Sequence, residues 1–372
     1  MQRGWKTYTT LRAALTCCLL CVALLVLVSL GGAFPGLSAG AFVLFAGPMW
    51  LLISTLTAGL LPALICLVMM LVSLAMSGSM LVCAFGAGYL LPMMAAWLWC
   101  LTEKKRFWTS CGVVLAALVA SLAAIFLLLQ GMTKGMLYDA AGGAAAAAVN
   151  TLPVRDTLLY MLASNGLLAL PASMQDTALV AVPGGYALSA EVVSELLLQV
   201  RSMVSSLLQG LVPSMLISGS AQNAVAGIAL SIYFGRRAAQ RRAYKRNEDE
   251  QEIPDLNMPP LRTWHIPRPW GLRIGLLASG YLLIRSGSNG MLVMLGTMMW
   301  QAFCFCFIVQ GLATLNHSQH RRGTAKVWRV AVIVLAFVFR FMQIALAVVG
   351  VVDQISDSRG LRKPLLPHNE EE

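Results

Sequence analysis

Long uncharged stretches of hydrophobic residues alternate with short basic clusters along the chain. Between Arg12 and Glu103 there is no charged residue. A transmembrane helix needs about 20 predominantly apolar residues, so this stretch predicts four consecutive spans joined by tight turns. Breaks between the spans are expected near Pro35, Gly59 and Gly78, where turn-forming residues interrupt the apolar pattern.

Further apolar stretches follow downstream. They predict a fifth span over residues 108–129, a sixth over 207–234, a seventh ending near 284, an eighth over 291–315 and a last one over 328–352. The expected fold is therefore all-α, a polytopic transmembrane helix bundle of about nine spans, with eight as the alternative.

The segment between the fifth and sixth spans, residues 131–206, is poor in Lys and Arg and is expected on the outer face. Its Ala-rich part, Ala140–Val149, is compatible with a helix or a flexible insert. Its second part predicts an amphipathic helix that runs into the sixth span, because apolar residues recur every three or four positions. This helix is expected on the outer leaflet, as a lid over the bundle, or simply packed on the protein. The apolar stripe consists of Leu188, Val192, Leu196, Val200, Met203, Leu207 and Leu211.

These patterns divide the chain into six segments. They are an N-terminal membrane block (1–130), the outer segment with its Ala-rich insert (131–206), the sixth span (207–235), a Pro-rich loop (236–270), a C-terminal membrane block (271–352) and a polar tail (353–372).

Composition agrees with a membrane environment. Hydrophobic residues make up 58% of the chain and charged residues only 12%, against about 25% charged residues in soluble domains. The lipid bilayer is therefore the expected solvent, and most soluble enzyme classes are excluded. In a membrane protein the net charge of +11 marks loops retained in the cytoplasm, so no nucleic-acid partner is expected.

Basic clusters at both ends of the four-span block predict a cytoplasmic N-terminus. The loop over 236–270 is also expected inside, as an extended segment that combines basic, acidic and proline residues. The tail fits the nine-span arrangement poorly, because nine spans would put the basic residues Arg359, Arg362 and Lys363 outside.

A search for catalytic motifs gives no phosphate-binding glycine loop, no zinc-protease motif and no nucleophile elbow. Proton transfer and nucleophilic attack need titratable groups, which the predicted spans lack. The chain is therefore expected not to be an enzyme, and no cofactor or metal is expected. His317 and His320 share a helical spacing but have no adjacent third ligand.

One charge falls near the centre of the last predicted span. Arg340 would cost at least about 2.5 kcal/mol there and is expected to face the bundle interior or a watery cavity. Two interpretations remain open: a polar pocket for a solute, or an arginine that only locks helix packing. The other polar residues within spans that could line such a pocket are Gln343, Gln310, Asn223 and Gln222.

Small residues recur every four positions on two predicted spans, where they allow close helix approach within the chain or against a partner subunit. One stripe is Gly112, Ala116, Ala120 and Ala124, and the other is Gly219, Asn223, Gly227 and Ser231.

Several short motifs together resemble the YybS-like family of uncharacterised bacterial multi-pass membrane proteins. They are Pro260–Pro267 with Trp264, Asn289 in the next turn, Gln310-Gly311-Leu312, and Gly350–Arg359 with Asp353 and Asp357. The family is in turn distantly similar to the substrate-binding components of energy-coupling-factor transporters. This resemblance implies a location in the bacterial plasma membrane, a small-solute ligand and energising transporter subunits as partners.

Two functional hypotheses follow. The first is a solute-binding transporter subunit with a polar cavity around Arg340. The alternative is a structural or regulatory membrane protein that recruits partners through its cytoplasmic loop.

Overall fold

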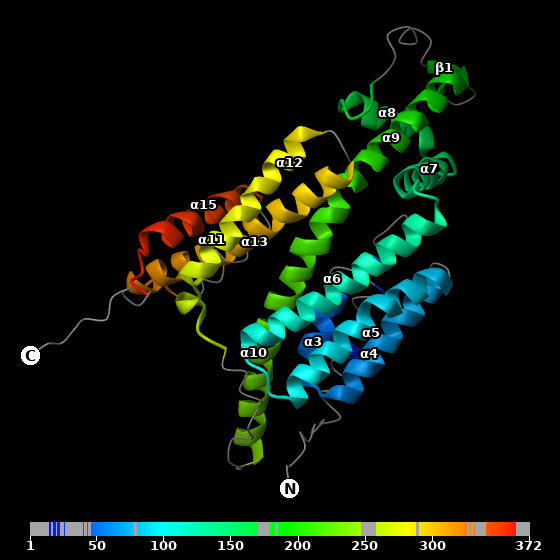
Figure 1. The fold of residues 1–372 in the computed structure, drawn as a ribbon. Coiled ribbons are helices and arrows are strands. Elements are labelled where there is room, and N and C mark those ends of the chain that lie inside the picture. The colour runs from blue at the N-terminus through cyan, green and yellow to red at the C-terminus, as the bar shows by residue number, and fades with distance from the viewer. Residues whose placement is uncertain are drawn as a thin grey trace, which may run out of the picture. The chain divides into compact units, whose positions relative to one another are not determined.

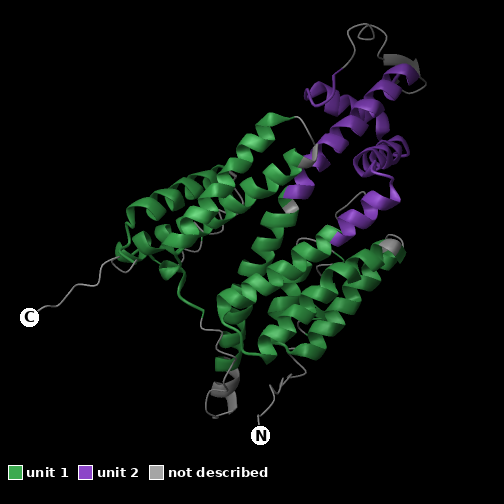
Figure 2. Cartoon of the chain, in the orientation of Figure 1, with its two compact units in different colours: residues 1–123, 214–372 green, residues 124–213 purple. Residues whose placement is uncertain are grey.

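The computed structural model describes residues 46–77, 80–169, 179–182, 185–246, 258–287, 290–325 and 340–361, with isolated positions between 15 and 43 and at 328 and 331. In these parts of the chain the structure is helical apart from one short hairpin (Figure 1). Two compact units are distinguished in Figure 2: residues 1–123 with 214–372, and residues 124–213.

The first unit begins with four helices of the N-terminal block. They are α3 (Gly47–Thr57), α4 (Leu60–Ser77), α5 (Met80–Thr102) and α6 (Phe107–Met132), of which α6 runs on into the second unit. The helix ends at Thr57 and Ser77 coincide with the predicted breaks near Gly59 and Gly78. The first predicted span and the break near Pro35 fall mostly outside the described residues.

Helix α10 (Ser220–Arg246) packs closely against α3. A Cβ atom added at Gly227 would lie 2.7 Å from Cδ1 of Leu52 and 3.5 Å from the backbone of Met49. The glycine therefore lets the two helices approach, as expected for one residue of the second small-residue stripe. Gly219 in the same stripe has no atom within 4 Å of such a Cβ position.

The second unit is built from α7 (Leu137–Asn150), α8 (Arg155–Ser164), β1 (Leu179–Val182), β2 (Gly185–Leu188) and α9 (Ala190–Ser214). Helix α7 contains the Ala-rich run, which is thus helical. The antiparallel pairing of β1 and β2 was not predicted. The side-chain amide of Gln199 exchanges two hydrogen bonds of 2.8 Å with the backbone of Ala169. The core of the unit consists of Leu159, Leu168, Leu188, Val192, Val193, Leu196 and Val200.

The predicted amphipathic helix is α9, and it continues directly into the sixth predicted span. A π-helical segment, η2 (Met215–Gly219), joins α9 to α10. Pro213 lies just before it and cannot donate a helical hydrogen bond. The Ser218 hydroxyl donates to the Ser214 carbonyl oxygen at 2.7 Å within this junction. The predicted stripe is buried in its first half, whereas Leu207 and Leu211 are exposed.

The C-terminal part of the first unit contains an irregular helical hairpin over residues 268–321, with one short helical element before it and one helix after it in the chain. Its elements are η3 (Leu261–Thr263), α11 (Arg268–Leu276), η4 (Leu277–Ser279), α12 (Gly280–Ser286), α13 (Gly290–Arg321) and α15 (Arg340–Ser356). Helix α13 contacts η3, α11, α12 and α15, so it is the central element of this group (Figure 1).

Among the described residues, four helices are long and apolar enough to cross a membrane: Val82–Thr102, Phe107–Met132, Ala190–Gln240 and Leu292–Arg321. Two shorter apolar helices are Leu60–Met76 and Phe341–Ser356. The chain is thus an all-helical, multi-pass membrane protein in its described parts. The number of nine spans is not shown, and most of residues 326–339 in the last predicted span lies outside the description.

Candidate functional site: a buried polar cluster at the end of α15

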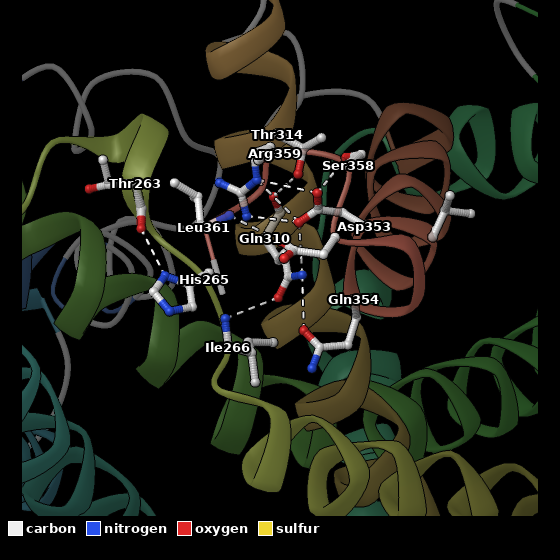
Figure 3. A network of polar contacts seen from close by, with 12 residues as sticks. Thr263, His265, Ile266, Gln310, Thr314, Asp353, Gln354, Ser358, Arg359 and Leu361 are labelled. Carbon is white, nitrogen blue, oxygen red and sulfur yellow. Dashed lines mark hydrogen bonds and ion pairs between the residues drawn. The ribbon is translucent and has the colours of Figure 1, made fainter. Parts of the chain in front are cut away.

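The end of α15 turns back on itself. Asp357 adopts φ +46° and Gly360 adopts φ +61°, both in the left-handed region. The Asp357 side chain accepts a hydrogen bond from the Leu361 amide at 3.2 Å, which stabilises the turn. The turn brings Arg359 back toward Asp353 in the last turn of the helix (Figure 3).

Arg359 and Asp353 form a buried ion pair. The distance from Nη2 to Oδ2 is 2.8 Å, and Nε donates to the two carboxylate oxygens at 3.1 and 3.3 Å. The Ser358 hydroxyl also donates to Oδ1. Only 2% of the arginine side chain and 4% of the aspartate side chain are exposed. Such a pair is stable only when further hydrogen bonds satisfy both charges.

Gln310 of α13 provides one of these bonds. Its Nε2 donates to Oδ2 of Asp353 and to Oε1 of Gln354, each at 3.0 Å. Its Oε1 accepts from the backbone amide of Ile266 at 3.2 Å. The side-chain amide can face only one way, since reversal would place its oxygen against the carboxylate. Figure 3 shows the three partners converging on Gln310 from α15 and from the segment before α11.

The segment before α11 makes two further contacts, one with Arg359 and one with the start of α6. Nη1 of Arg359 donates to the backbone carbonyl oxygen of Arg262 at 3.0 Å. The indole of Trp264 donates to the Pro259 carbonyl oxygen at 2.7 Å, and its ring centroid lies 5.2 Å from that of Phe107 and 4.9 Å from that of Trp108. Residues 259–266 are therefore fixed between the end of α15 and the start of α6.

Glycines bring the supporting helices together. A Cβ atom at Gly311 of α13 would collide with the Leu346 carbonyl oxygen, and one at Gly350 of α15 would collide with the Phe307 carbonyl oxygen. Gly271 of α11 lies against the side chain of Gln354 in the same way. The polar cluster thus lies beside the backbone contact of α13 with α15, where α11 packs on the Gln354 side chain.

The chemistry of the cluster is that of an internal lock. Both oxygens of Asp353 accept hydrogen bonds, and the two charges neutralise each other. In the part of the chain that the structure describes, no three His, Cys, Asp or Glu side chains gather as a metal site. The arrangement can hold helices in register, because breaking it would leave a buried charge without its partner.

Most residues that carried the family resemblance meet here. Trp264, Gln310, Asp353 and Arg359 belong to the cluster, and Gly311 makes the adjacent helix contact. Pro267 precedes the first residue of α11, and Asp357 stabilises the turn after α15. Asn289 lies outside the described residues.

The residues expected to line one polar pocket have different partners. Gln310 belongs to the cluster, whereas Asn223 is buried and hydrogen-bonds to Tyr89. Gln222 is exposed, and Gln343 is half-buried. Arg340 is the first residue of α15, and its side chain lies outside the description.

Sequence reasoning singled out Asp353 and Arg359 but did not pair them, and it missed Gln354, Ser358 and Ile266 as partners. The available signal was local: turn-forming residues after an apolar helix place a basic residue six positions after an acidic one. The bonds to Arg262 and Ile266, in contrast, join positions 97 and 44 residues apart, which a single sequence does not reveal.

The small-residue stripe on α6 has a different environment. Gly112, Ala116, Ala120 and Ala124 are all exposed. No atom lies within 4 Å of a Cβ position at Gly112. Among the described residues, the structure therefore gives this stripe no helix partner.

Comparison with protein families gives one match, which covers residues 22–354. No curated protein and no solved structure matches the chain. The matched region includes all helices described above except the last residues of α15, and it includes Asp353 and Gln354 of the cluster. The chain therefore belongs to the family described as predicted membrane protein (DUF2232).

Proposed function

We propose that the protein is a membrane scaffold that holds its basic segment, residues 258–270, at one membrane face and recruits acidic partners there. The observation that carries the proposal is the hydrogen bond from buried Arg359 to the Arg262 carbonyl oxygen. It joins the end of α15 to this segment, which follows a long polar stretch in the sequence. A fixed backbone lowers the entropy lost when a partner binds.

The charges of the segment support this role. The side chains of Arg262, His265 and Arg268 are exposed, while the two charges of the cluster neutralise each other in the interior. In the described part of the chain, no carboxylate pairs with Arg262 or Arg268. Exposed cations of this kind attract an acidic partner.

The proposal also concerns topology. Residues joined by hydrogen bonds lie at the same depth of the membrane, so the turn at 357–361 belongs on the same side as residues 258–266. Two segments on the same side are separated by an even number of crossings. This supports the eight-span alternative, with the tail inside, over the nine-span arrangement. The basic residues Arg359, Arg362 and Lys363 then no longer conflict with the charge distribution of cytoplasmic segments.

A pair of reporter fusions tests this topology. Green fluorescent protein is fused after Glu372 or inserted between residues 247 and 257. It does not become fluorescent when it is exported through the general pathway, so its fluorescence reports a cytoplasmic position. Both fusions should fluoresce, and periplasmic alkaline phosphatase at the same two sites should be inactive. Opposite signals at the two sites would contradict the proposal and favour nine spans.

Recruitment is tested by site-specific photocrosslinking in cells. A photoreactive residue replaces exposed His265, and the control position is exposed Leu282 of α12. We expect a discrete protein adduct at position 265 that is absent at 282. The adduct should disappear in the Arg262→Glu variant, which reverses a side-chain charge but retains the carbonyl that Arg359 binds.

Two outcomes would overturn the scaffold proposal. One is that position 265 yields no protein adduct. The other is an adduct that persists in Arg262→Glu, because attraction to an acidic partner would then play no part. The yield of folded protein in each variant is compared by size-exclusion chromatography in detergent, so that misfolding is recognised.

Solute binding, with energising subunits as partners, is the second candidate. The observation that favours it is the hydrogen bond between buried Tyr89 of α5 and buried Asn223 of α10 inside the membrane block. Such polar groups are unusual in an apolar bundle and often mark a solute path. A vitamin or small anion that raises the melting temperature, with the shift lost in Arg340→Leu and Asn223→Leu, would support this candidate. Neither candidate function includes a catalytic step.

A further inference from the structure

The short helix α11 has two chemically different faces. Gly271 faces inward and lies directly against the side chain of Gln354. The outward side chains are large and apolar: Trp270, Leu272 and Leu276 are 55%, 75% and 66% exposed. In a membrane protein, leucines this exposed are well suited to contact lipid acyl chains.

An arginine lies within this apolar surface. Arg273 is exposed, between Leu272 and Leu276 in sequence, and its guanidinium carbon is 5.0 Å from the centroid of the Trp270 ring. A cation over an indole face is attracted by the ring electrons, and the attraction increases as water is removed. Trp270 therefore holds the charge of Arg273 at the boundary between the apolar and polar parts of the surface.

Among the described residues, no carboxylate forms an ion pair with this arginine. In the described part of the chain, neither Arg273 nor Arg268, which begins the same helix, forms an ion pair with a carboxylate. The nearby carboxylate of Asp353 is already bound by Arg359 and Gln310 in the interior. Within the part of the chain that the structure describes, two exposed cations beside exposed leucines thus have no carboxylate partner.

We infer that the outer face of α11 binds the phosphate headgroup of an anionic phospholipid. Arg273 and Arg268 bind the phosphate, Trp270 fixes the Arg273 side chain, and Leu272 and Leu276 contact the acyl chains. A headgroup supplies negative charge at the depth where tryptophan and arginine occur in membrane proteins. This inference goes beyond the recruitment of acidic proteins and uses different side chains.

The test is retention of defined lipids by the full-length protein in native mass spectrometry. The probes are phosphatidylglycerol and zwitterionic phosphatidylcholine of the same chain length. We expect phosphatidylglycerol to be retained preferentially, and Arg273→Gln to weaken its binding about fivefold, as the loss of one surface cation would. Arg268→Gln combined with Arg273→Gln should abolish the preference.

The matched control is Arg285→Gln. Arg285 is an exposed arginine near the end of α12, beside the turn between α12 and α13. It lies three residues after the exposed Leu282. Among the described residues no tryptophan ring lies against its guanidinium, so its replacement should leave retention unchanged. Trp270→Leu keeps every charge and the apolar surface but removes the ring, and it should weaken phosphatidylglycerol binding as well.

Three results would overturn the inference. The first is equal retention of the two lipids by the unmodified protein. The second is an equal loss of phosphatidylglycerol retention in Arg273→Gln and Arg285→Gln. The third is an unaltered lipid preference in Arg273→Gln together with loss of the crosslinked acidic protein in that variant. Melting temperatures of the variants in detergent detect misfolding. Arg262→Glu should leave lipid retention unchanged, so this inference and the scaffold proposal fail separately.

Discussion

Two helix contacts in the first unit both depend on glycine but differ in chemistry. Helices α3 and α10 meet through Gly227, which faces the end of the Leu52 side chain. Helices α13 and α15 meet through Gly311 and Gly350, which face backbone carbonyl groups, and the buried cluster of Asp353, Arg359 and Gln310 lies beside them. The glycine of the first contact faces an apolar side chain, whereas the second contact combines backbone packing with charge.

The difference concerns specificity. Lipid tails are as apolar as leucine, so apolar side chains give helices little preference for one partner over another in the membrane. A polar cluster has one arrangement that satisfies all of its donors and acceptors, and every slipped arrangement leaves some unsatisfied. The α13–α15 contact should therefore have a defined register, while the α3–α10 contact should tolerate small shifts.

The largest effect is expected when the ion pair is broken. Replacing Arg359 by Met leaves the Asp353 carboxylate buried without its cation, which should lower the free energy of unfolding by about 3–5 kcal/mol. The measurement is denaturant unfolding in mixed micelles, followed by tryptophan fluorescence. The double variant Asp353→Leu/Arg359→Met should be less destabilised than the sum of the two single variants.

The control is Arg285→Met, which removes an exposed arginine and should change stability by less than about 0.5 kcal/mol. Additive effects of the two single substitutions would show that Arg359 and Asp353 do not interact, contrary to the geometry.

An added methyl group should separate the two glycine contacts. In Gly311→Ala the new Cβ meets a backbone carbonyl that cannot move without shifting α15, and overpacking of this kind costs about 1–3 kcal/mol. In Gly227→Ala the new Cβ meets the end of a leucine side chain, which can change rotamer, so a smaller loss is expected. The same unfolding assay compares them, and an equal or larger loss in Gly227→Ala would contradict the proposed difference in tolerance.

The smallest effect is expected on the exposed stripe of α6. In the described part of the chain, nothing lies within 4 Å of a Cβ atom at Gly112. Gly112→Ala should therefore not destabilise the protein, and the higher helix propensity of alanine should even stabilise it slightly, by less than about 1 kcal/mol. A loss above about 1 kcal/mol would mean that a partner helix covers this stripe.

How far the sequence predicted the structure depends on the range of the interaction. The helix ends at Thr57 and Ser77, and the continuous passage from the amphipathic helix into α10, follow from local apolar periodicity and turn residues. The strands β1 and β2 were missed because four-residue segments are too short for a distinct period.

The candidate site was predicted only as separate motifs. Trp264, Gln310, Asp353 and Arg359 were singled out, but the bond of Gln310 to Asp353 and that of Arg359 to Arg262 join positions far apart in the chain. Conversely, the spacing of Gly112 and Ala116 predicted close packing that the described residues do not provide, because small residues permit an approach without requiring one.

The junction of α9, η2 and α10 has a mechanical consequence. Helical backbone runs without a linker from Ala190 to Gln240, over 51 residues, which corresponds to roughly 75 Å of helix. The hydrocarbon core of a bilayer is only about 30 Å thick. A single perpendicular crossing needs less than half of this length, and Pro213, which cannot donate a helical hydrogen bond, interrupts the hydrogen-bond pattern where the second unit meets the first, so α9 and α10 need not move as one body.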